Sequence, residues 1–104
     1  MENIFWKGYC KEERSTAINK IQGVVSAYGD IIDFKFFSDI SITMVMEIKE
    51  CNIDKLHNKL RESLGIDDYK YLNSISEKER TIYFNITFLK GTGNLKIETP
   101  SVPG

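Results

Sequence analysis

The sequence is poor in residues that cross-link a chain or bind metals, with two cysteines and one histidine among 104 residues. Cys10 and Cys51 lack the spacing of metal ligands, so they predict two reduced thiols in a reducing compartment. His57 leaves no second imidazole for a metal site or a histidine pair. Its neighbours Asn58 and Lys59 are polar, so we expect an exposed side chain on a helix. We therefore expect no metal, no cofactor and no catalytic residues.

An excess of charge of one sign is also missing, because 14 basic side chains face 15 acidic ones. This balance provides no electrostatic attraction for nucleic acid or for an anionic membrane surface. Residues 34–37 (FKFF) and 69–71 (YKY) interleave aromatic residues with lysine, as RNA-binding sheets do. However, residues 40–48 contain no aromatic side chain on which a base could stack. We therefore expect no nucleic-acid partner.

Long apolar runs are absent, since the uninterrupted ones are a few residues long, against the ~18 needed to span a membrane. The first residues, MENIFWKGYC, contain no apolar run of signal-peptide length. We therefore expect a cytoplasmic protein with no membrane partner. Its composition, 41% hydrophobic and 28% charged, is typical of one globular domain that needs no disulfide or metal to fold.

A first helix is predicted after the acidic connection that follows residue 10. Its apolar residues recur at helical spacing, at Ala17, Ile18, Ile21, Val24, Val25 and Tyr28. Gly23 lies inside this helix and predicts its close packing on a sheet. Gly29 fits a left-handed cap that ends the helix.

Strands are predicted on both sides of this helix. Residues 4–9 and 31–37 are rich in aromatic and β-branched side chains, and residues 40–48 alternate between apolar and mixed positions. Ser38 and Asp39 form a plausible tight turn, so residues 31–48 predict a hairpin.

A second helix is predicted to begin at Asn52, which suits an N-cap, and to end at Gly65. Its apolar stripe consists of Ile53, Leu56, Leu60 and Leu64. Two later segments, residues 69–75 and 81–89, could each supply the fourth strand of the sheet.

The order strand, helix, strand, strand, helix, strand predicts an α+β fold. We expect a ferredoxin-like βαββαβ sandwich, with an antiparallel sheet and two helices on one of its faces. Residues 1–90 would form this domain. Residues 91–104 would be an extension in which LKIE adds an edge strand, on this chain or on a neighbour, before a mobile tail.

Residues 8–48 resemble the ACT domain, a small regulatory module of amino-acid metabolism. The family typically opens its first helix with Asp-Arg-Pro-Gly, where this chain has ERST (Glu13, Arg14, Ser15 and Thr16). The segments AINKIQGVVSAYG and DIIDFKFF match the family's helix and following strand. The resemblance covers under half of the chain, and the later elements agree only as topology.

This resemblance implies a non-catalytic regulatory domain that binds a small metabolite, such as an amino acid, at the interface of a homodimer. Glu13, Arg14, Ser15 and Thr16 would bind the ligand, with Arg14 holding its carboxylate. Thr16 stands where the family has glycine, and its side chain would obstruct a backbone approach to the ligand.

Three alternatives remain open. Arg14 could instead form an exposed salt bridge at the helix start. The whole chain could be a ligand-free protein-protein assembly or dimerisation module, because an open sheet edge invites a protein partner. An enzyme that uses Cys10 as a nucleophile is a remote alternative, which requires His57 or a carboxylate beside that thiol.

Overall fold

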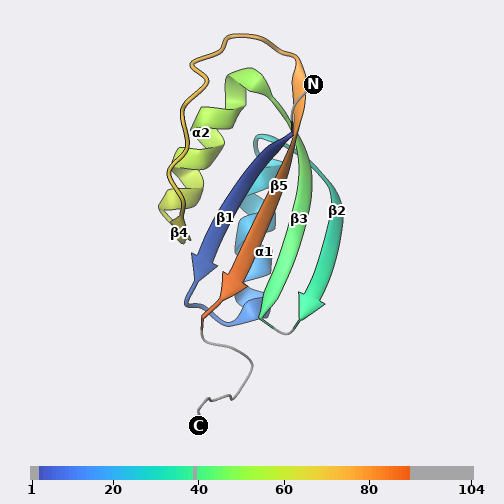
Figure 1. The fold of residues 1–104 in the computed structure, drawn as a ribbon, viewed down its shortest axis with the longest axis vertical. Helices are drawn as coiled ribbons and strands as arrows, with labels where there is room; N and C mark the ends of the chain where they lie inside the picture. The colour runs from blue at the N-terminus through green and yellow to red at the C-terminus, as the bar shows by residue number, and fades with distance from the viewer. Residues whose placement is uncertain (1–2, 39, 90–104) are drawn as a thin grey trace, which may run out of the picture.

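The computed structural model describes residues 3–38 and 40–89 (Figure 1). The elements follow in the order β1 (Ile4–Cys10), α1 (Arg14–Ser26), β2 (Gly29–Ser38), β3 (Ser41–Lys49), α2 (Glu50–Arg61), β4 (Gly65–Ile66) and β5 (Glu79–Phe88). The predicted strand LKIE and the tail after it lie outside the described residues. The hairpin predicted for residues 31–48 is confirmed as β2 and β3.

The α+β class is confirmed, and both helices lie on the same face of the sheet (Figure 1). The five strands have the order β2-β3-β5-β1-β4. The prediction of an antiparallel sheet is wrong, because β5 runs parallel to β1 and antiparallel to β3. The ferredoxin-like order is not confirmed, since the last strand lies between β1 and β3 rather than at an edge.

Residues 67–78, called here the return segment, explain the parallel pairing. The short strand β4 pairs antiparallel with β1 at the far edge of the sheet. The return segment then runs back alongside α2, so that β5 enters the sheet at the same end as β1 (Figure 1). Parallel neighbours need a connection of this kind. Residues 69–75 lie in it and form no strand. Of the two segments that could supply the fourth strand, residues 81–89 are therefore the ones that do, as part of β5.

The C-terminal end of α1 differs from the prediction. The helix ends at Ser26, with Ala27 as its C-cap in the right-handed region. Gly29 is therefore not a left-handed cap but the first residue of β2. A β-carbon at this position would lie 2.4 Å from Ile48 Cδ1 and 2.5 Å from Glu47 O. Glycine is needed there because β2 and β3 approach each other closely.

The start of α2 also differs, because the helix begins at Glu50 and not after Asn52. Asn52 lies within its first turn, and its Nδ2 donates a hydrogen bond to the carbonyl oxygen of Tyr28, 3.5 Å away. The predicted N-cap therefore links α2 to the end of α1 instead.

The core lies between the helices and the sheet. Every second residue of β5 is buried there, as are the apolar stripes of both helices, which bury Ala17, Ile21, Val25, Ile53, Leu56 and Leu60. Trp6 on β1 is 2% exposed and has ring contacts with His57 on α2 and Phe84 on β5. This layer leaves the other face of the sheet without a helix in the described part of the chain.

Candidate functional site

The face of the sheet that points away from α1 and α2 is called here the open face. Strand register places its side chains in rows that run across the strands. The central row, called the aromatic row, contains Phe5 on β1, Tyr83 on β5 and Val45 on β3, and it ends at the exposed Asp33 on β2. The Phe5 and Tyr83 rings are stacked, with centroids 5.3 Å apart and planes 19° apart. Phe5 remains 73% exposed and Tyr83 is half-buried, whereas Val45 is only 5% exposed, so Phe5 supplies most of the apolar surface that this row presents to solvent.

Two lysines terminate the neighbouring row, called the lysine row. Lys7 pairs with Asn85, Asn85 with Thr43, and Thr43 with Lys35, on four successive strands. Asn85 Nδ2 donates hydrogen bonds to Thr43 Oγ1 (3.1 Å) and to the carbonyl oxygen of Ile42 (3.3 Å). Lys7 is the central residue of β1 and its side chain is exposed. The middle of the row is therefore fixed, while its ends are charged.

A hollow of about 330 Å³ lies over these two rows. Its lining residues are Phe5, Trp6, Lys7, Lys35, Phe37, Thr43, Tyr83 and Asn85. Phe37 is 66% exposed, so aromatic rings from β1, β2 and β5 surround the polar floor. A pocket that is mainly apolar with a few convergent polar groups is the usual form of a binding site.

Acidic side chains lie on the opposite side of the aromatic row. Thr81 pairs with Glu47, and Glu47 pairs with Asp30, which forms the row called here the acid row. Asp30 is exposed and Glu47 is half-buried. The open face therefore carries lysines on one side of the aromatic row and acidic side chains on the other, and the row itself is apolar on β1, β5 and β3.

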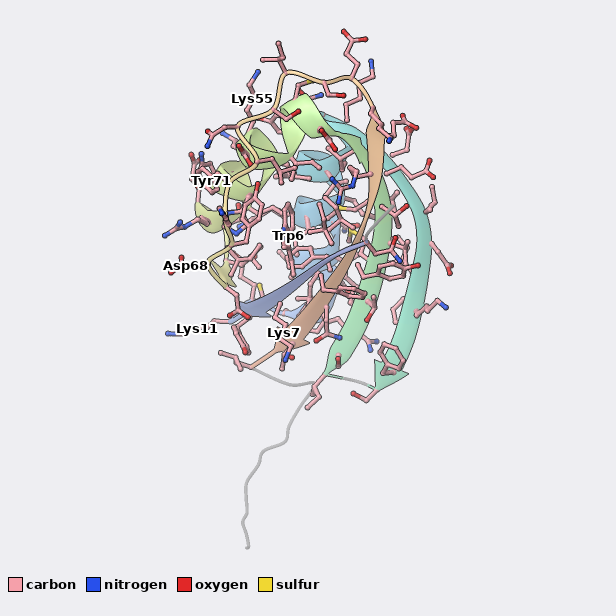
Figure 2. The ribbon with its side chains drawn as sticks, turned by 45° about the horizontal axis from the view of Figure 1, so that its top comes forward. Trp6, Lys7, Lys11, Lys55, Asp68 and Tyr71 are labelled. Atoms are coloured by element: carbon pink, nitrogen blue, oxygen red, sulfur yellow. The ribbon has the colours of Figure 1, made fainter. Side chains whose placement is uncertain are left out.

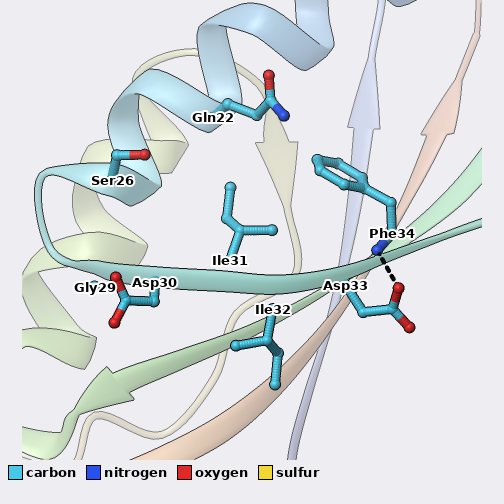
Figure 3. A pocket seen from close by; sticks show the side chains of 8 residues that line it. All are labelled: Gln22, Ser26, Gly29, Asp30, Ile31, Ile32, Asp33 and Phe34. Carbon is cyan, nitrogen blue, oxygen red and sulfur yellow. Dashed lines mark hydrogen bonds between the residues drawn. The ribbon is translucent and has the colours of Figure 1, made fainter.

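A second, wider hollow of about 770 Å³ lies between the end of α1 and β2. Figure 3 shows Ile31 and Phe34 on the side of β2 that faces α1, and Ile32 and Asp33 on the other side. The register shifts between Ile31 and Asp33. The Phe34 amide donates a hydrogen bond to Asp33 Oδ1 at 2.9 Å (Figure 3). This bulge interrupts the outer edge of β2, which makes it a poor template for another strand.

The four residues predicted to bind a ligand lie together at the start of α1. Glu13 is the N-cap, and its Oε1 accepts hydrogen bonds from the Thr16 amide at 3.2 Å and from the Thr16 hydroxyl at 3.3 Å. Arg14 is half-buried and Ser15 is exposed. These contacts satisfy the free amides of the helix start. None of the four residues lines either hollow.

His57 was predicted to be exposed, and that prediction is wrong, because its side chain is 0% exposed. Its ring lies 5.1 Å from that of Trp6 and 4.4 Å from that of Tyr69. His57 Nε2 lies 2.9 Å from the carbonyl oxygen of Asp67, so Nε2 carries the hydrogen and donates it. Burial lowers the pKa of His57 and keeps the ring neutral. The polar neighbours in the sequence did not reveal the return segment that covers it.

Asp54 holds the same segment from α2. Its carboxylate accepts hydrogen bonds from the amides of Leu72 at 3.0 Å and Asn73 at 2.8 Å, and from the Tyr69 hydroxyl. Burial raises the pKa of Asp54, but these hydrogen bonds outweigh it and lower the pKa below its usual value. Burial and the bond to Asp54 raise the pKa of Tyr69. Tyr71, which lies beside α2 in Figure 2, donates a hydrogen bond to Asn58.

These polar groups therefore attach the return segment to α2. Cys10 is 3% exposed, and the ring neighbours of His57 are Trp6, Tyr69 and Tyr71. Among residues 3–38 and 40–89, no three histidine, cysteine or acidic side chains come together to hold a metal ion. No helix within these ranges has the length and apolar character required to cross a membrane.

The open face is the surface that the sequence did not reveal. The alternation of apolar and polar residues indicated which residues of a strand share a side. Which residues of different strands lie next to each other in a row, however, depends on the position of β5. Tyr83 meets Phe5 only because β5 lies beside β1. Comparisons of the chain with protein-family models, with curated proteins and with solved structures found no match.

Proposed function

We propose that this chain is a non-catalytic assembly module that forms a homodimer through its open face. The aromatic row is the observation that carries this proposal, because it places Phe5 and Tyr83 side by side on a face without a covering helix in the described residues. Exposed apolar patches of this kind on a folded domain typically mark contact surfaces.

The energetic argument rests on the exposed aromatic area. Phe5 and Phe37 are 73% and 66% exposed and lie on different strands of the same face. Burial of one such ring contributes about 2 kcal/mol, at roughly 25 cal/mol per Å² of apolar surface. Aromatic side chains are also among the residues that dominate protein interfaces. A protein surface is therefore the occupant that this face favours.

The alternative route to assembly, strand addition at the edge, has less support. β2 is an edge strand of the described sheet, but its register shifts occur between Ile31 and Asp33 and again between Phe36 and Ser38. The Asp33 carboxylate also accepts a hydrogen bond from the Phe34 amide, so this amide is not available to pair with another strand. These features are the ones that natural sheets use against edge pairing.

Metabolite binding at Glu13, Arg14, Ser15 and Thr16 stays a prediction from the ACT resemblance. The geometry supports it less than assembly, because the Glu13 carboxylate is engaged in capping α1. The homodimer that the same resemblance implies is retained in the proposal above.

The proposal is tested by replacing Phe5. We expect the wild-type protein to sediment as a dimer, and Phe5→Thr to raise the dimer dissociation constant at least about 10-fold, equivalent to ~1.4 kcal/mol. Threonine retains β propensity, so the strand should persist. Sedimentation velocity over a concentration series measures both constants.

Ile75→Thr is the matched control, because Ile75 is 95% exposed but lies in the return segment, away from the open face. This variant should dimerise like the wild type. A wild-type protein that stays monomeric up to roughly 1 mM, or a dimer that Phe5→Thr leaves intact, would contradict the proposal.

A further inference from the structure

We infer that the second copy packs its open face on the first with the strands reversed, so that Lys35 of each copy faces Asp30 of the other. This inference rests on the proposed function and adds the orientation and the contacts that select it. The two-fold axis would run along the aromatic row, which would then pack against the same row of the other copy.

Charge on the two sides of the aromatic row is the first observation. Lys7 and Lys35 lie one row to one side, while Glu47 and Asp30 lie one row to the other. None of these four side chains forms an ion pair with another described residue. The face therefore carries both signs on the two sides of the aromatic row, and these four charges are uncompensated among the described residues.

Symmetry decides between two ways of stacking identical faces. A two-fold axis along the strands would keep each row opposite itself and bring Lys7 against Lys35 of the other copy. An axis along the aromatic row exchanges the lysine row with the acid row on β5, β3 and β2. On β2 this exchange places Lys35 opposite Asp30, and Asp33, which lies on the axis, faces Asp33 of the other copy. Like charges opposed across an interface cost several kcal/mol. The first arrangement opposes two Lys7–Lys35 pairs, whereas the second opposes one pair of Asp33 carboxylates and gains two Lys35–Asp30 pairs, so the second is favoured.

The dimensions of the face fit such a contact. Four strands at ~4.8 Å spacing, seven to ten residues in length, make a surface roughly 19 Å by 30 Å. With side-chain relief, this approaches the ~800 Å² per partner of a standard interface. Packed sheets lie ~10 Å apart with strand directions within about 30°. An extended lysine and an aspartate can meet across that gap.

The charge pattern also favours a second copy over an unrelated protein. An isologous contact requires a surface that is complementary to itself. Here Thr43 and Glu47 lie two residues to either side of Val45 on β3, and their β2 partners are Lys35 and Asp30, so both signs lie at equal register from the aromatic row, as self-complementarity demands. An unrelated partner would need no such balance.

Charge reversal tests the orientation. Lys35→Asp places two carboxylates at each contact, and Asp30→Lys places two ammonium groups there. We expect each variant alone to raise the dimer dissociation constant about 10-fold or more. The double variant Lys35→Asp/Asp30→Lys restores opposite charges at both contacts, so its constant should return to within about 3-fold of wild type, under ~0.7 kcal/mol.

An equimolar mixture of the two single variants is the sharper measurement. One chain then carries only acidic and the other only basic groups at positions 30 and 35, so the mixture should form a heterodimer, measured by native mass spectrometry. Lys55→Asp is the control, since Lys55 is exposed on α2, outside the open face. It changes net charge by the same amount and should leave the dimer intact.

The possible failures can be told apart. A dimer that Phe5→Thr dissociates, but whose charge variants neither weaken it nor rescue one another, would overturn the orientation and leave the proposed function standing. A dimer insensitive to Phe5→Thr, or a protein that is monomeric throughout, would overturn both. If Lys55→Asp weakened the dimer as much as Lys35→Asp, the loss of affinity would be explained by net charge alone. That result would also overturn the inferred contacts.

Discussion

At the residue scale, two glycines have opposite roles. A β-carbon at Gly8 would lie 2.7 Å from Leu64 Cδ1 and 2.7 Å from Phe84 Cε1, so β1 needs glycine beneath the end of α2. A β-carbon at Gly23 would meet nothing within 4 Å. The sequence-based prediction that Gly23 serves close helix-sheet packing is therefore wrong, and this glycine only weakens α1.

These environments predict opposite effects of the same substitution. Gly23→Ala should raise the free energy of unfolding by about 0.5–1 kcal/mol, because alanine restricts the unfolded chain and favours a helix. Gly8→Ala should lower it by about 1–3 kcal/mol through overpacking. Urea unfolding followed by circular dichroism measures both. A destabilised Gly23→Ala would show that this face of α1 is covered.

At the scale of elements, the return segment is held by hydrogen bonds to α2 rather than by a sheet. His57 donates to Asp67 at one end of it, and Asp54 accepts from Leu72 and Asn73 further along. Near its other end, the amide of Cys51 donates to the carbonyl oxygen of Ser76 at 2.9 Å. Its attachment therefore depends on the ionisation of buried side chains.

This dependence predicts a loss of stability in mild acid. The pKa of His57 is lower in the folded protein than the ~6.5 of an unfolded chain. The unfolded state therefore binds the extra proton first, and the free energy of unfolding falls as the pH drops below about 6.5. We expect thermal melts to show this fall as the pH drops through about 6.5.

The variant His57→Gln provides the comparison. Glutamine keeps a donor for the Asp67 carbonyl but does not titrate, so the curve over the same pH range should be flatter, although the protein starts less stable. An equally steep curve in the variant would assign the pH dependence to other groups. The lowered pKa of Asp54 adds a separate loss at lower pH, as the pH falls through its own titration.

At the scale of the whole molecule, binding of any ligand is linked to global stability. A metabolite present at 100 times its dissociation constant would add ~2.7 kcal/mol to the free energy of unfolding. Because Glu13 caps α1 and the open face favours a second copy, we expect no amino acid to raise the melting temperature. A thermal-shift screen of wild type and Arg14→Ala measures this. A rise in melting temperature seen in the wild type but not in Arg14→Ala would support metabolite binding at Arg14.

The sequence by itself determined the elements that local spacing encodes. Alternation in residues 81–89 set which side of β5 is buried, and helical spacing set the buried stripes of α1 and α2. In β3, by contrast, residues 42–46 are buried on both sides of the strand. Turn residues set the β2–β3 hairpin. Each of these depends on residues within a few positions of one another.

The tertiary structure alone decided how those elements meet. Only the path of the return segment carries β5 between β1 and β3, and it is the same segment that buries His57. The rows of the open face follow from that placement, since Phe5 and Tyr83 are remote in the chain. Periodicity indicates which side of a strand is apolar, but it does not say which strand lies next to it. That choice depends on the packing free energy of the assembled layers.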